Sequence, residues 1–330
     1  MSNSEVKKFS WGILGTGGIA QAFAADLSHL PDHAIAAVGS RTLSAAQAFS
    51  ESYPGSVAYG SYQELVESDV DAIYIATPHT FHAEHALLAL NAGKPVLCEK
   101  PFTINAGQAR SVVDLARSKN LPLLEAIWTR FLPHIHLMQH IIERGDLGEI
   151  LTVSADHGQY LPREKAARLW EPALGGGALL DLGIYSITLA HLVLGAPEKI
   201  ISDVTKTDEG VDLQTSMIFH YQNGAQAILT CTMANRTAIT ATIAGSKARL
   251  ELDASFYAPT SMRLITRDGD VTEYPNTYIG HGLREEAVEF ARMVRAGEIE
   301  SPLMPHSRSI EIMELMDSVR REHGVIYPGE

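Results

Sequence analysis

Short apolar runs alternate with amphipathic segments along the first 125 residues. The runs predicted as strands are Phe9–Leu14, Ala34–Gly39, Ala72–Ala76, Pro95–Cys98 and Leu121–Glu125. The segments between them show helical periodicity or begin at a helix-capping residue, and are Ile19–Leu30, Ser44–Tyr53, Ser61–Glu67, Phe81–Ala92 and Asn105–Lys119. This alternation predicts βαβ units, and therefore a mostly parallel, doubly wound sheet covered by helices on both faces.

The pattern changes after about residue 130, where a glycine-rich loop and an apolar helix precede a series of short runs. The runs predicted as strands are Lys199–Thr205, Gln214–Tyr221, Ala225–Thr232, Ala238–Ala244 and Arg249–Leu252. Turn sequences at 221–224 and 267–270 separate them as in an antiparallel sheet. Two helices follow, near Leu283–Ala296 and His306–His323. We therefore expect a nucleotide-binding domain over residues 1–125 and an α+β domain over residues 126–330, with the C-terminal helices free to pack back on the first domain.

Composition narrows the class of protein further. A chain of 330 residues suggests two domains, and 45% hydrophobic with 20% charged residues is typical of a soluble globular protein. The net charge of −13 argues against nucleic acid and anionic membranes as partners. We identify no apolar run of the roughly 18 residues that a membrane span requires and no signal peptide in residues 1–15. With Cys98 and Cys231 as the two cysteines, both expected to be buried thiols, the expected location is the cytoplasm.

The first strand runs directly into the pattern G-x-G-x-x-A, at Gly15-Thr16-Gly17-Gly18-Ile19-Ala20. Gly15 permits a tight turn, Gly17 lets the backbone approach a pyrophosphate, and Ala20 lets the helix pack closely on the strand. The helix start then offers free N–H groups to phosphates. The alternative is a glycine-rich turn without a ligand, but the βαβ context favours a dinucleotide site formed by residues 15–19.

The end of the second strand distinguishes between the two nicotinamide cofactors. An NAD site usually has an acidic residue there, whereas this chain has Ser40 and Arg41. Ser40 is able to donate a hydrogen bond, and the permanent charge of Arg41 suits a 2′-phosphate. We expect NADP, with NAD still possible; in the alternative, Arg41 is a solvated surface residue.

Polar residues follow two further strands at their carboxyl ends, where open α/β sheets bind ligands. Thr77, Pro78 and His79 follow one strand, and Glu99 with Lys100 follows the other. We expect them, with His82, to contact the cofactor. Lys100 is also a candidate to contact substrate and to lower the pKa of a neighbouring group, against the alternative of a plain loop residue. His79 and His82 resemble a metal-binding pair, but no third ligand cluster lies nearby and we expect no metal.

A run of three glycines leads into an apolar segment, Gly175–Ile187, with two polar side chains. As an α-helix, this segment places Asp181 and Tyr185 four residues apart on one face. They are candidates for proton transfer in alcohol oxidation, in which a nicotinamide takes the hydride and the protein takes the hydroxyl proton. A cation such as Lys100 favours the phenolate of Tyr185. In the alternative, Asp181 pairs with a nearby base and Tyr185 is a core residue.

Four motifs together, G-T-G-G-I-A, A-T-P-H, E-K-P and G-G-G-A-L-L-D-L-G-I-Y, resemble the glucose–fructose oxidoreductase/inositol dehydrogenase/MocA family from Phe9 to Pro328. Three stretches (124–133, 175–185 and 301–320) resemble its branch of dimeric dihydrodiol dehydrogenases and NADP-dependent D-xylose dehydrogenases. The resemblance implies a Rossmann domain followed by a large, open, mostly antiparallel sheet. It also implies a homodimer or larger homo-oligomer formed through the exposed face of that sheet.

The resemblance assigns roles to matching positions. Lys100 resembles the active-site lysine, and Asp181 and Tyr185 resemble the substrate-side carboxylate and the acid/base. Many members have histidine where this chain has Tyr185, and tyrosine agrees with the dihydrodiol dehydrogenase branch. Residues that resemble the lining of the substrate cleft are Trp128, Arg130, Arg168 and Trp170.

The function expected from these features is NADP-dependent hydride transfer to or from a secondary alcohol of a sugar, polyol or cyclic vicinal diol. Two alternatives stay open. One is an oxidoreductase that retains its cofactor between two sugar substrates, and the other is a non-catalytic NADP-binding sensor. Retention of Lys100, Asp181 and Tyr185 together argues against the sensor, which has no need of all three.

Overall fold

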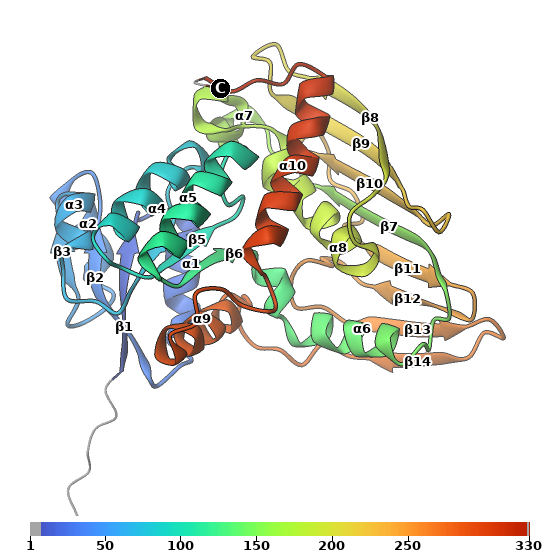
Figure 1. Cartoon of the computed structure of the whole chain (residues 1–330), viewed down its shortest axis with the longest axis horizontal. Coiled ribbons are helices and arrows are strands. Elements are labelled where there is room, and N and C mark those ends of the chain that lie inside the picture. Colours follow the sequence, from blue (N-terminus) through green and yellow to red (C-terminus); the bar gives the residue numbers. More distant parts are fainter. Residues whose placement is uncertain (1–7, 329) are drawn as a thin grey trace, which may run out of the picture. The chain divides into compact units, whose positions relative to one another are not determined.

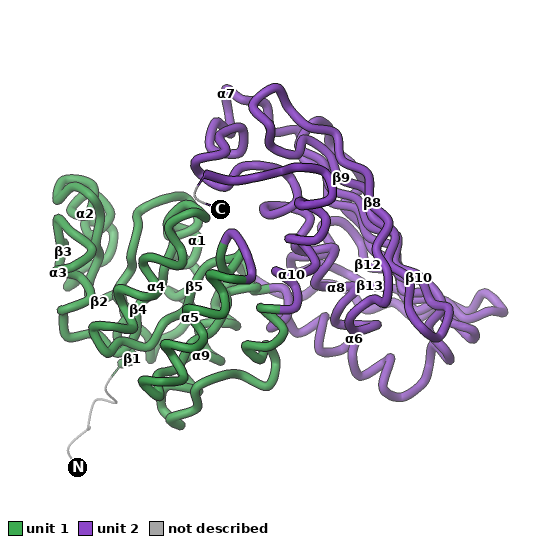
Figure 2. Tube along the Cα trace, turned by 45° about the horizontal axis from the view of Figure 1, so that its top comes forward, with its two compact units in different colours: residues 1–103, 107–128, 280–310 green, residues 104–106, 129–279, 311–330 purple. Residues whose placement is uncertain are grey.

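The computed structural model describes residues 8–328 and 330 and contains two β-sheets. The chain divides into two compact units (Figure 2). The first unit comprises residues 1–103, 107–128 and 280–310, and the second comprises 104–106, 129–279 and 311–330. A late segment of the chain therefore belongs to the first unit, while the division at residue 125 stays a prediction. The N-terminal residues used to argue against a signal peptide lie partly outside the described residues.

The first unit contains a six-stranded parallel sheet in the order β3-β2-β1-β4-β5-β6 (Figure 1). Its strands are β1 Phe9–Leu14, β2 His33–Gly39, β3 Val57–Tyr59, β4 Ala72–Ile75, β5 Val96–Glu99 and β6 Leu123–Ala126. Its helices are α1 Gly18–Leu27, α2 Leu43–Ser50, α3 Tyr62–Val66, α4 His82–Asn91, α5 Ala106–Lys119 (whose first residue falls in the second unit) and α9 Arg284–Ala296. The doubly wound fold is confirmed. The sequence interpretation omitted only β3, a short strand with no buried residue.

The late helix α9 packs on the first unit through aromatic contacts. Phe290 of α9 lies against Trp11 of β1, with ring centroids 5.9 Å apart, and Trp11 also contacts Phe23 of α1. The carboxylate of Asp26, in α1, accepts hydrogen bonds of 2.7–2.8 Å from three successive backbone N–H groups at residues 281–283. These N–H groups precede α9, so a carboxylate more than 250 residues away in sequence caps the start of this helix.

The second unit contains an eight-stranded sheet in the order β14-β13-β12-β11-β7-β10-β9-β8. Its strands are β7 Ile150–Gly158, β8 Lys199–Lys206, β9 Asp212–His220, β10 Gln226–Thr232, β11 Ala241–Gly245, β12 Ala248–Leu252, β13 Met262–Thr266 and β14 Val271–Tyr274. Only β7 and β10 pair in parallel, so the mostly antiparallel sheet is confirmed. The sequence interpretation missed the central strand β7, whose apolar residues are interrupted by Ser154, Asp156 and His157. It also missed β13 and the exposed β14.

One face of this sheet is covered by helices and the other is bare in the described part of the chain (Figures 1 and 2). The covering helices are α6 Pro133–Glu143, α8 Ile184–Leu194 and the second-unit part of α10 His306–Glu322. On the bare face Ile201, Ile218 and Ile228 are neighbours in register across β8, β9 and β10, and each is 37–46% exposed. We refer to these three residues as the outer isoleucine stripe.

One helical segment in the described chain, Pro172–Leu194, is long and apolar enough to cross a membrane by length and composition. The expectation that no such run exists is therefore wrong. However, 83% of its apolar window is buried inside the protein, and α8 packs on β7 and β10. Burial against the sheet explains why this segment is apolar on all sides.

Candidate functional site

The loop after β1 has the geometry of a phosphate-binding turn. Gly15 adopts φ = +105°, and a Cβ atom there would lie 2.8 Å from the carbonyl oxygen of Ala76, so only glycine fits. By contrast, Cβ atoms on Gly17 and Gly18 would have no atom within 4 Å. No side chain of the described residues caps α1, and its first turn has no acidic residue. The open space and the uncapped N–H groups fit the pyrophosphate of a dinucleotide, which residues 15–19 would hold.

Ser40 and Arg41 lie at the end of β2, beside the same edge of the sheet. Ser40 is buried and its N–H donates to the carbonyl of Tyr59 at 3.2 Å. Arg41 is exposed, and its charge opposes the upward shift that burial imposes on the pKa of Tyr62. An exposed arginine at this position is compatible both with a 2′-phosphate contact and with a surface role, so the cofactor preference stays a prediction.

His82 joins the loops that follow β4 and β5. It is fully buried, with Nδ1 2.8 Å from the carbonyl oxygen of Pro101 and Nε2 2.8 Å from that of Thr77. Burial lowers its pKa to about 3, and the two carbonyl oxygens oppose that shift. Since both ring nitrogens lie 2.8 Å from backbone carbonyl oxygens, His82 links the two loops, and its contact with a cofactor stays a prediction. His79 is also buried, with its ring 5.7 Å from that of His82, and Thr77 contacts Nδ1 of His85 at 2.9 Å.

The backbone of Lys100 is fixed by the carboxylate next to it. Glu99 is buried, accepts a hydrogen bond from the phenol of Tyr74, and accepts one from the Lys100 N–H at 3.2 Å. Tyr74 stacks on Phe23 at 3.7 Å, and burial, with the Glu99 charge second, raises its pKa well above the ordinary value. The peptide bond between Lys100 and Pro101 is cis. Lys100 is thus half-buried at the carboxyl end of β5, where ligands of such sheets bind.

In the second unit, the segment that carries Asp181 and Tyr185 is not the regular α-helix expected from the sequence. Residues Leu179–Gly183 form a π-helical turn, and α8 begins at Ile184. Asp181 lies in this π turn and Tyr185 in the first turn of α8. Such turns replace i→i+4 with i→i+5 hydrogen bonds and are frequent at functional sites. The backbone groups between Asp181 and Tyr185 therefore have different hydrogen-bond partners from those of a regular α-helix.

Two residues predicted separately are brought together here. Arg168 donates from Nη2 to Oδ1 of Asp181 at 3.0 Å, in an ion pair whose arginine side chain is 44% exposed and whose aspartate side chain is 11% exposed. The pairing with a base that was the alternative for Asp181 is therefore present. A half-exposed arginine on a mostly buried carboxylate leaves the pair accessible to a polar ligand.

Tyr185 is 5% exposed and packs in a cluster of rings that the sequence interpretation missed. Its ring lies 4.5 Å from that of Tyr257 and 5.4 Å from that of His157, and these two stack at 4.3 Å. Nδ1 of His157 contacts the carbonyl oxygen of Leu182 at 3.2 Å, while Nε2 contacts the amide of Gln159 at 2.9 Å. A neutral imidazole satisfies both contacts, with Nδ1–H donating and Nε2 accepting. No local pattern reveals this cluster, because its members come from three distant segments.

The remaining predicted lining residues lie near turns of this region. Trp128–Phe131 form a 3₁₀ turn in which Thr129 donates to the carbonyl oxygen of Tyr257 at 2.7 Å. Arg130 is buried, and its carbonyl oxygen contacts the His136 ring at 3.1 Å. Trp170 is half-buried and donates from its indole N–H to the carbonyl of residue 161 at 3.0 Å. The turn containing Arg130 is thus adjacent to the tyrosine that packs on Tyr185.

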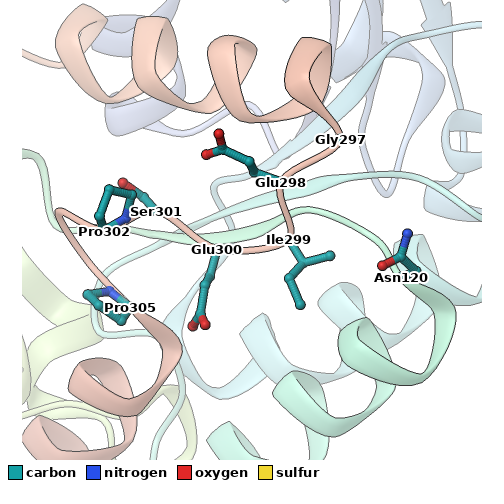
Figure 3. A pocket seen from close by; sticks show the side chains of 8 residues that line it. All are labelled: Asn120, Gly297, Glu298, Ile299, Glu300, Ser301, Pro302 and Pro305. Carbon is teal, nitrogen blue, oxygen red and sulfur yellow. The ribbon is translucent and has the colours of Figure 1, made fainter.

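A cavity of about 530 Å³ in the first unit is a poor candidate for the site (Figure 3). It is lined by Asn120, Gly297, Glu298, Ile299, Glu300, Ser301, Pro302 and Pro305. Asn120 precedes β6, so the cavity lies at the amino end of that strand, away from the loops described above. Its two carboxylates are paired, Glu298 with Arg292 and Glu300 with Arg117. Within the described residues, no three His, Cys, Asp or Glu side chains gather to hold a metal ion.

Comparison with known proteins defines the class. Residues 9–126 match the oxidoreductase family with an NAD-binding Rossmann fold, and residues 135–251 match the GFO/IDH/MocA C-terminal domain. The chain therefore belongs to the GFO/IDH/MocA oxidoreductase family, and it is an NAD(P)-dependent oxidoreductase with a Rossmann domain.

Individual relatives extend over nearly the whole chain. Trans-1,2-dihydrobenzene-1,2-diol dehydrogenase of Bos taurus is 35% identical, covering 96% of this chain and 98% of the relative. D-xylose 1-dehydrogenase (NADP(+)) of Hypocrea jecorina is also 35% identical, covering 99% and 95%. Among solved structures, the 3-ketoreductase KijD10 of Actinomadura kijaniata in complex with NADP and TDP-benzene has a TM-score of 0.85 at 28% identity, covering 96% and 98%.

Proposed function

We propose that this enzyme uses NADP to transfer hydride to or from a secondary alcohol of a sugar, polyol or cyclic vicinal diol. The observation that carries the proposal is the arrangement of Tyr185, a buried phenol whose ring packs against those of His157 and Tyr257. Tyr185 lies in the first turn of α8, directly after the π turn that contains Asp181. The relatives support the substrate class. Two are named as dehydrogenases of a cyclic diol and of D-xylose, and a third is a 3-ketoreductase whose structure contains NADP.

In this mechanism NADP, when bound, supplies the hydride acceptor at its nicotinamide ring. The protein then has to remove the hydroxyl proton, and we assign that step to the Tyr185 hydroxyl. Free tyrosine, with a pKa of about 10, is a poor base at neutral pH, so a nearby cation is required to favour the phenolate. We assign that role to Lys100, and the binding of a substrate hydroxyl to Asp181 with Arg168. In the reverse direction Tyr185 returns its proton to the developing alkoxide.

A screen of NADP⁺ and NAD⁺ reduction over aldoses, inositols and cyclic diols tests this function. The wild-type enzyme is expected to reduce NADP⁺ with at least one class. Tyr185→Phe is expected to lower the single-turnover hydride-transfer rate by about 10²–10⁴-fold, which is the usual contribution of general acid–base catalysis. Tyr257→Phe is the matched control, since it removes a neighbouring hydroxyl but keeps the ring. An unchanged rate and pH dependence in Tyr185→Phe would remove this tyrosine from the mechanism.

The cofactor preference has its own test. We infer that Ser40 and Arg41 contact the 2′-phosphate of NADP. Arg41→Ala is then expected to lower the NADP/NAD ratio of kcat/KM by roughly tenfold or more, as loss of one charged contact does. An unchanged ratio contradicts the assignment.

Two alternatives are distinguished by simple observations. NADPH present in the absorbance spectrum of the purified protein favours the enzyme that retains its cofactor between two sugars. Tight NADPH binding without turnover across the whole panel favours the sensor.

We further propose that the chain forms a homodimer through the outer isoleucine stripe and acts in the cytoplasm. Three exposed isoleucines in register on a bare sheet face form an apolar surface of the kind that partners cover. Ile218→Lys, at the centre of the stripe, is expected to give a monomer by sedimentation, whereas Ile326→Lys changes an exposed isoleucine of the C-terminal segment and serves as control.

A further inference from the structure

Three neighbouring strands each contribute one buried residue beneath the π turn Leu179–Gly183. His157 on β7, Cys231 on β10 and Thr215 on β9 pair with one another in register and form a row across the sheet. A Cβ atom on Gly183 would lie 2.9 Å from the sulfur of Cys231. The turn therefore rests directly on this row, and its conformation depends on the strands below it.

Asp212 extends the row to the start of the turn. It begins β9 and is 1% exposed. Its Oδ2 accepts a hydrogen bond from the N–H of Leu179 at 2.6 Å and from the hydroxyl of Thr215 at 3.2 Å. Its Oδ1 has no hydrogen-bond partner in the part of the chain that the structure describes. A Cβ atom on Gly177 would lie only 2.1 Å from Oδ1, so the glycine before the turn makes room for this carboxyl group.

We propose that Asp212 is a positioning residue for hydride transfer, because its carboxylate fixes the first turn of the helix that carries Asp181 and Tyr185. The proposal rests on the function proposed above, in which Tyr185 is the proton-transfer group. An ionised carboxylate accepts a stronger hydrogen bond from an N–H group than a neutral carboxyl does. It also lies at the positive end of the helix dipole. The turn is therefore held most firmly when Asp212 is charged.

The surroundings of Asp212 place its ionisation in the neutral range. Burial raises its pKa to about 7, against the opposing effects of the Leu179 N–H and, from α10, the positive charge of Arg320. Tyr327 and Cys231 are the other titratable groups that face it, and burial raises the pKa of both well above their ordinary values, so they stay neutral. The hydrogen bond from the Leu179 N–H to Asp212 consequently becomes stronger as the pH rises through about 7.

A second anchor holds the loop before the turn and does not titrate in this range. The phenol of Tyr327 donates to the carbonyl oxygen of Gly176 at 2.6 Å, and the guanidinium of Arg320 lies 4.7 Å over the Tyr327 ring. The loop thus stays in place when Asp212 is protonated, and the effect of Asp212 is confined to the turn itself.

The experiment compares full-length wild type, Asp212→Asn and Asp26→Asn. Asn keeps an acceptor oxygen for the N–H group but cannot ionise. Asp26 is the matched control because its carboxylate caps α9 in the same way in the first unit. Amide hydrogen exchange of a peptide spanning 176–187, expressed relative to the intrinsic exchange rate, and single-turnover hydride transfer are followed from about pH 5.5 to 8.5.

In the wild type, protection of this peptide against hydrogen exchange is expected to rise roughly fivefold as the pH passes through 7, because Asp212 ionises and its hydrogen bond to the Leu179 N–H becomes charge-assisted. The same ionisation is expected in the hydride-transfer profile. Asp212→Asn is expected to lose both changes while binding NADP⁺ with unchanged affinity, and Asp26→Asn is expected to keep them.

The wild-type exchange measurement needs no variant and no turnover, so constant protection across this range overturns the proposal even where Asp212→Asn fails to fold. In a second outcome, Asp212→Asn changes the exchange protection of the peptide but leaves the pH profile of hydride transfer unchanged. If Tyr185→Phe abolishes hydride transfer, this outcome overturns the positioning role of Asp212. If Tyr185→Phe is still active, the proposed function is itself wrong, and with it the role of Asp212 in the reaction.

Discussion

Two helices of this molecule begin at a carboxylate supplied by a distant part of the chain, one in each unit. At the start of α9, Asp26 accepts hydrogen bonds from three backbone N–H groups, and both of its oxygens are used. At the start of the Asp181–Tyr185 helix, Asp212 accepts from one N–H group and one hydroxyl, and its second oxygen has no partner among the described residues. The same device thus serves a fully satisfied structural cap and an under-satisfied, titratable one.

Burial and hydrogen bonding act in opposite directions on the charge of a carboxyl group. At Asp26, three N–H donors occupy both oxygens of the carboxylate. With a single N–H donor, burial dominates and moves the pKa of Asp212 to about 7. We infer that the second arrangement serves the turn that leads to the proposed proton-transfer group, whereas the first holds the start of α9 in place.

The largest expected effect comes from removing the satisfied cap. Asp26→Ala leaves three N–H groups without their acceptor, and those of Gly282 and Leu283 are buried. Since each unsatisfied buried group costs about 1–3 kcal/mol, we expect a loss of at least about 2 kcal/mol of unfolding free energy, measured by thermal or denaturant unfolding. Asp26→Asn retains one acceptor and is expected to lose less. A loss below about 1 kcal/mol for Asp26→Ala contradicts the view that this carboxylate fixes α9.

The next effect concerns Asp212, the carboxylate at the start of the π turn. Gly177→Ala strains a backbone at φ = +109°, which costs about 1–3 kcal/mol, and forces a methyl group onto Oδ1 of Asp212. We expect lower stability and a hydride-transfer rate reduced by roughly tenfold or more, since 1.4 kcal/mol is a factor of ten. Gly210→Ala is the matched control, because Gly210 has φ = +94° but no atom within 4 Å of its Cβ position. Equal losses in the two variants show that strain alone, and not Asp212, is responsible.

A third buried carboxyl group, Glu286 in α9, tests the role of hydrogen bonds from the opposite direction. It is fully buried, and neither oxygen has a hydrogen-bond partner among the described residues. Burial, followed by the charge of Glu99, raises its pKa well above the ordinary value. Since the pKa is higher in the folded state, its stabilising contribution is complete below the unfolded value of about 4.3 and is lost as the pH rises above it.

Between about pH 5 and pH 8, Glu286→Gln is therefore expected to lose less unfolding free energy than the wild type, because glutamine does not ionise. Glu286→Met, which has no buried acceptor, is expected to raise the unfolding free energy at pH 8 by about 1–3 kcal/mol. The pH dependence of chemical unfolding of the three proteins checks both results. A wild type whose stability does not fall relative to Glu286→Gln above pH 5 disproves the neutral buried state.

The comparison also explains what the sequence was able to predict. The glycine loop and the strand ends of the first unit are local features, so the sequence predicts Gly15, Thr77 and Lys100 as site residues from their position after apolar runs. The doubly wound sheet followed from the same alternation. The division into two units did not, since α9 joins the first unit through Phe290, whose packing partner Trp11 lies 279 positions earlier in the chain.

In the second unit the decisive contacts are long-range, and sequence reasoning failed where they act. The π turn was interpreted as a plain α-helix, because the groups that hold it, Asp212 and His157, lie on strands distant in sequence. His157 lies on β7, which the sequence pattern does not predict as a strand because polar residues interrupt its apolar positions. Residue type and spacing predict Asp181 and Tyr185 as site residues, but the ring of Tyr257 beside Tyr185 has no local pattern that reveals it.

The smallest expected effect tests whether buried caps, and not exposed ion pairs, determine how α9 is held. Arg292 pairs with Glu289 at 2.8 Å and with Glu298 at 2.7 Å on the exposed side of this helix. Exposed pairs of this kind contribute about 0.2–1 kcal/mol, because water and salt screen them. Arg292→Ala is therefore expected to cost less than 1 kcal/mol, and the cost is expected to vanish in high salt, whereas that of Asp26→Ala persists. A salt-independent loss comparable with that of Asp26→Ala would show that the far end of α9, and not its carboxylate cap, anchors the helix to the first unit.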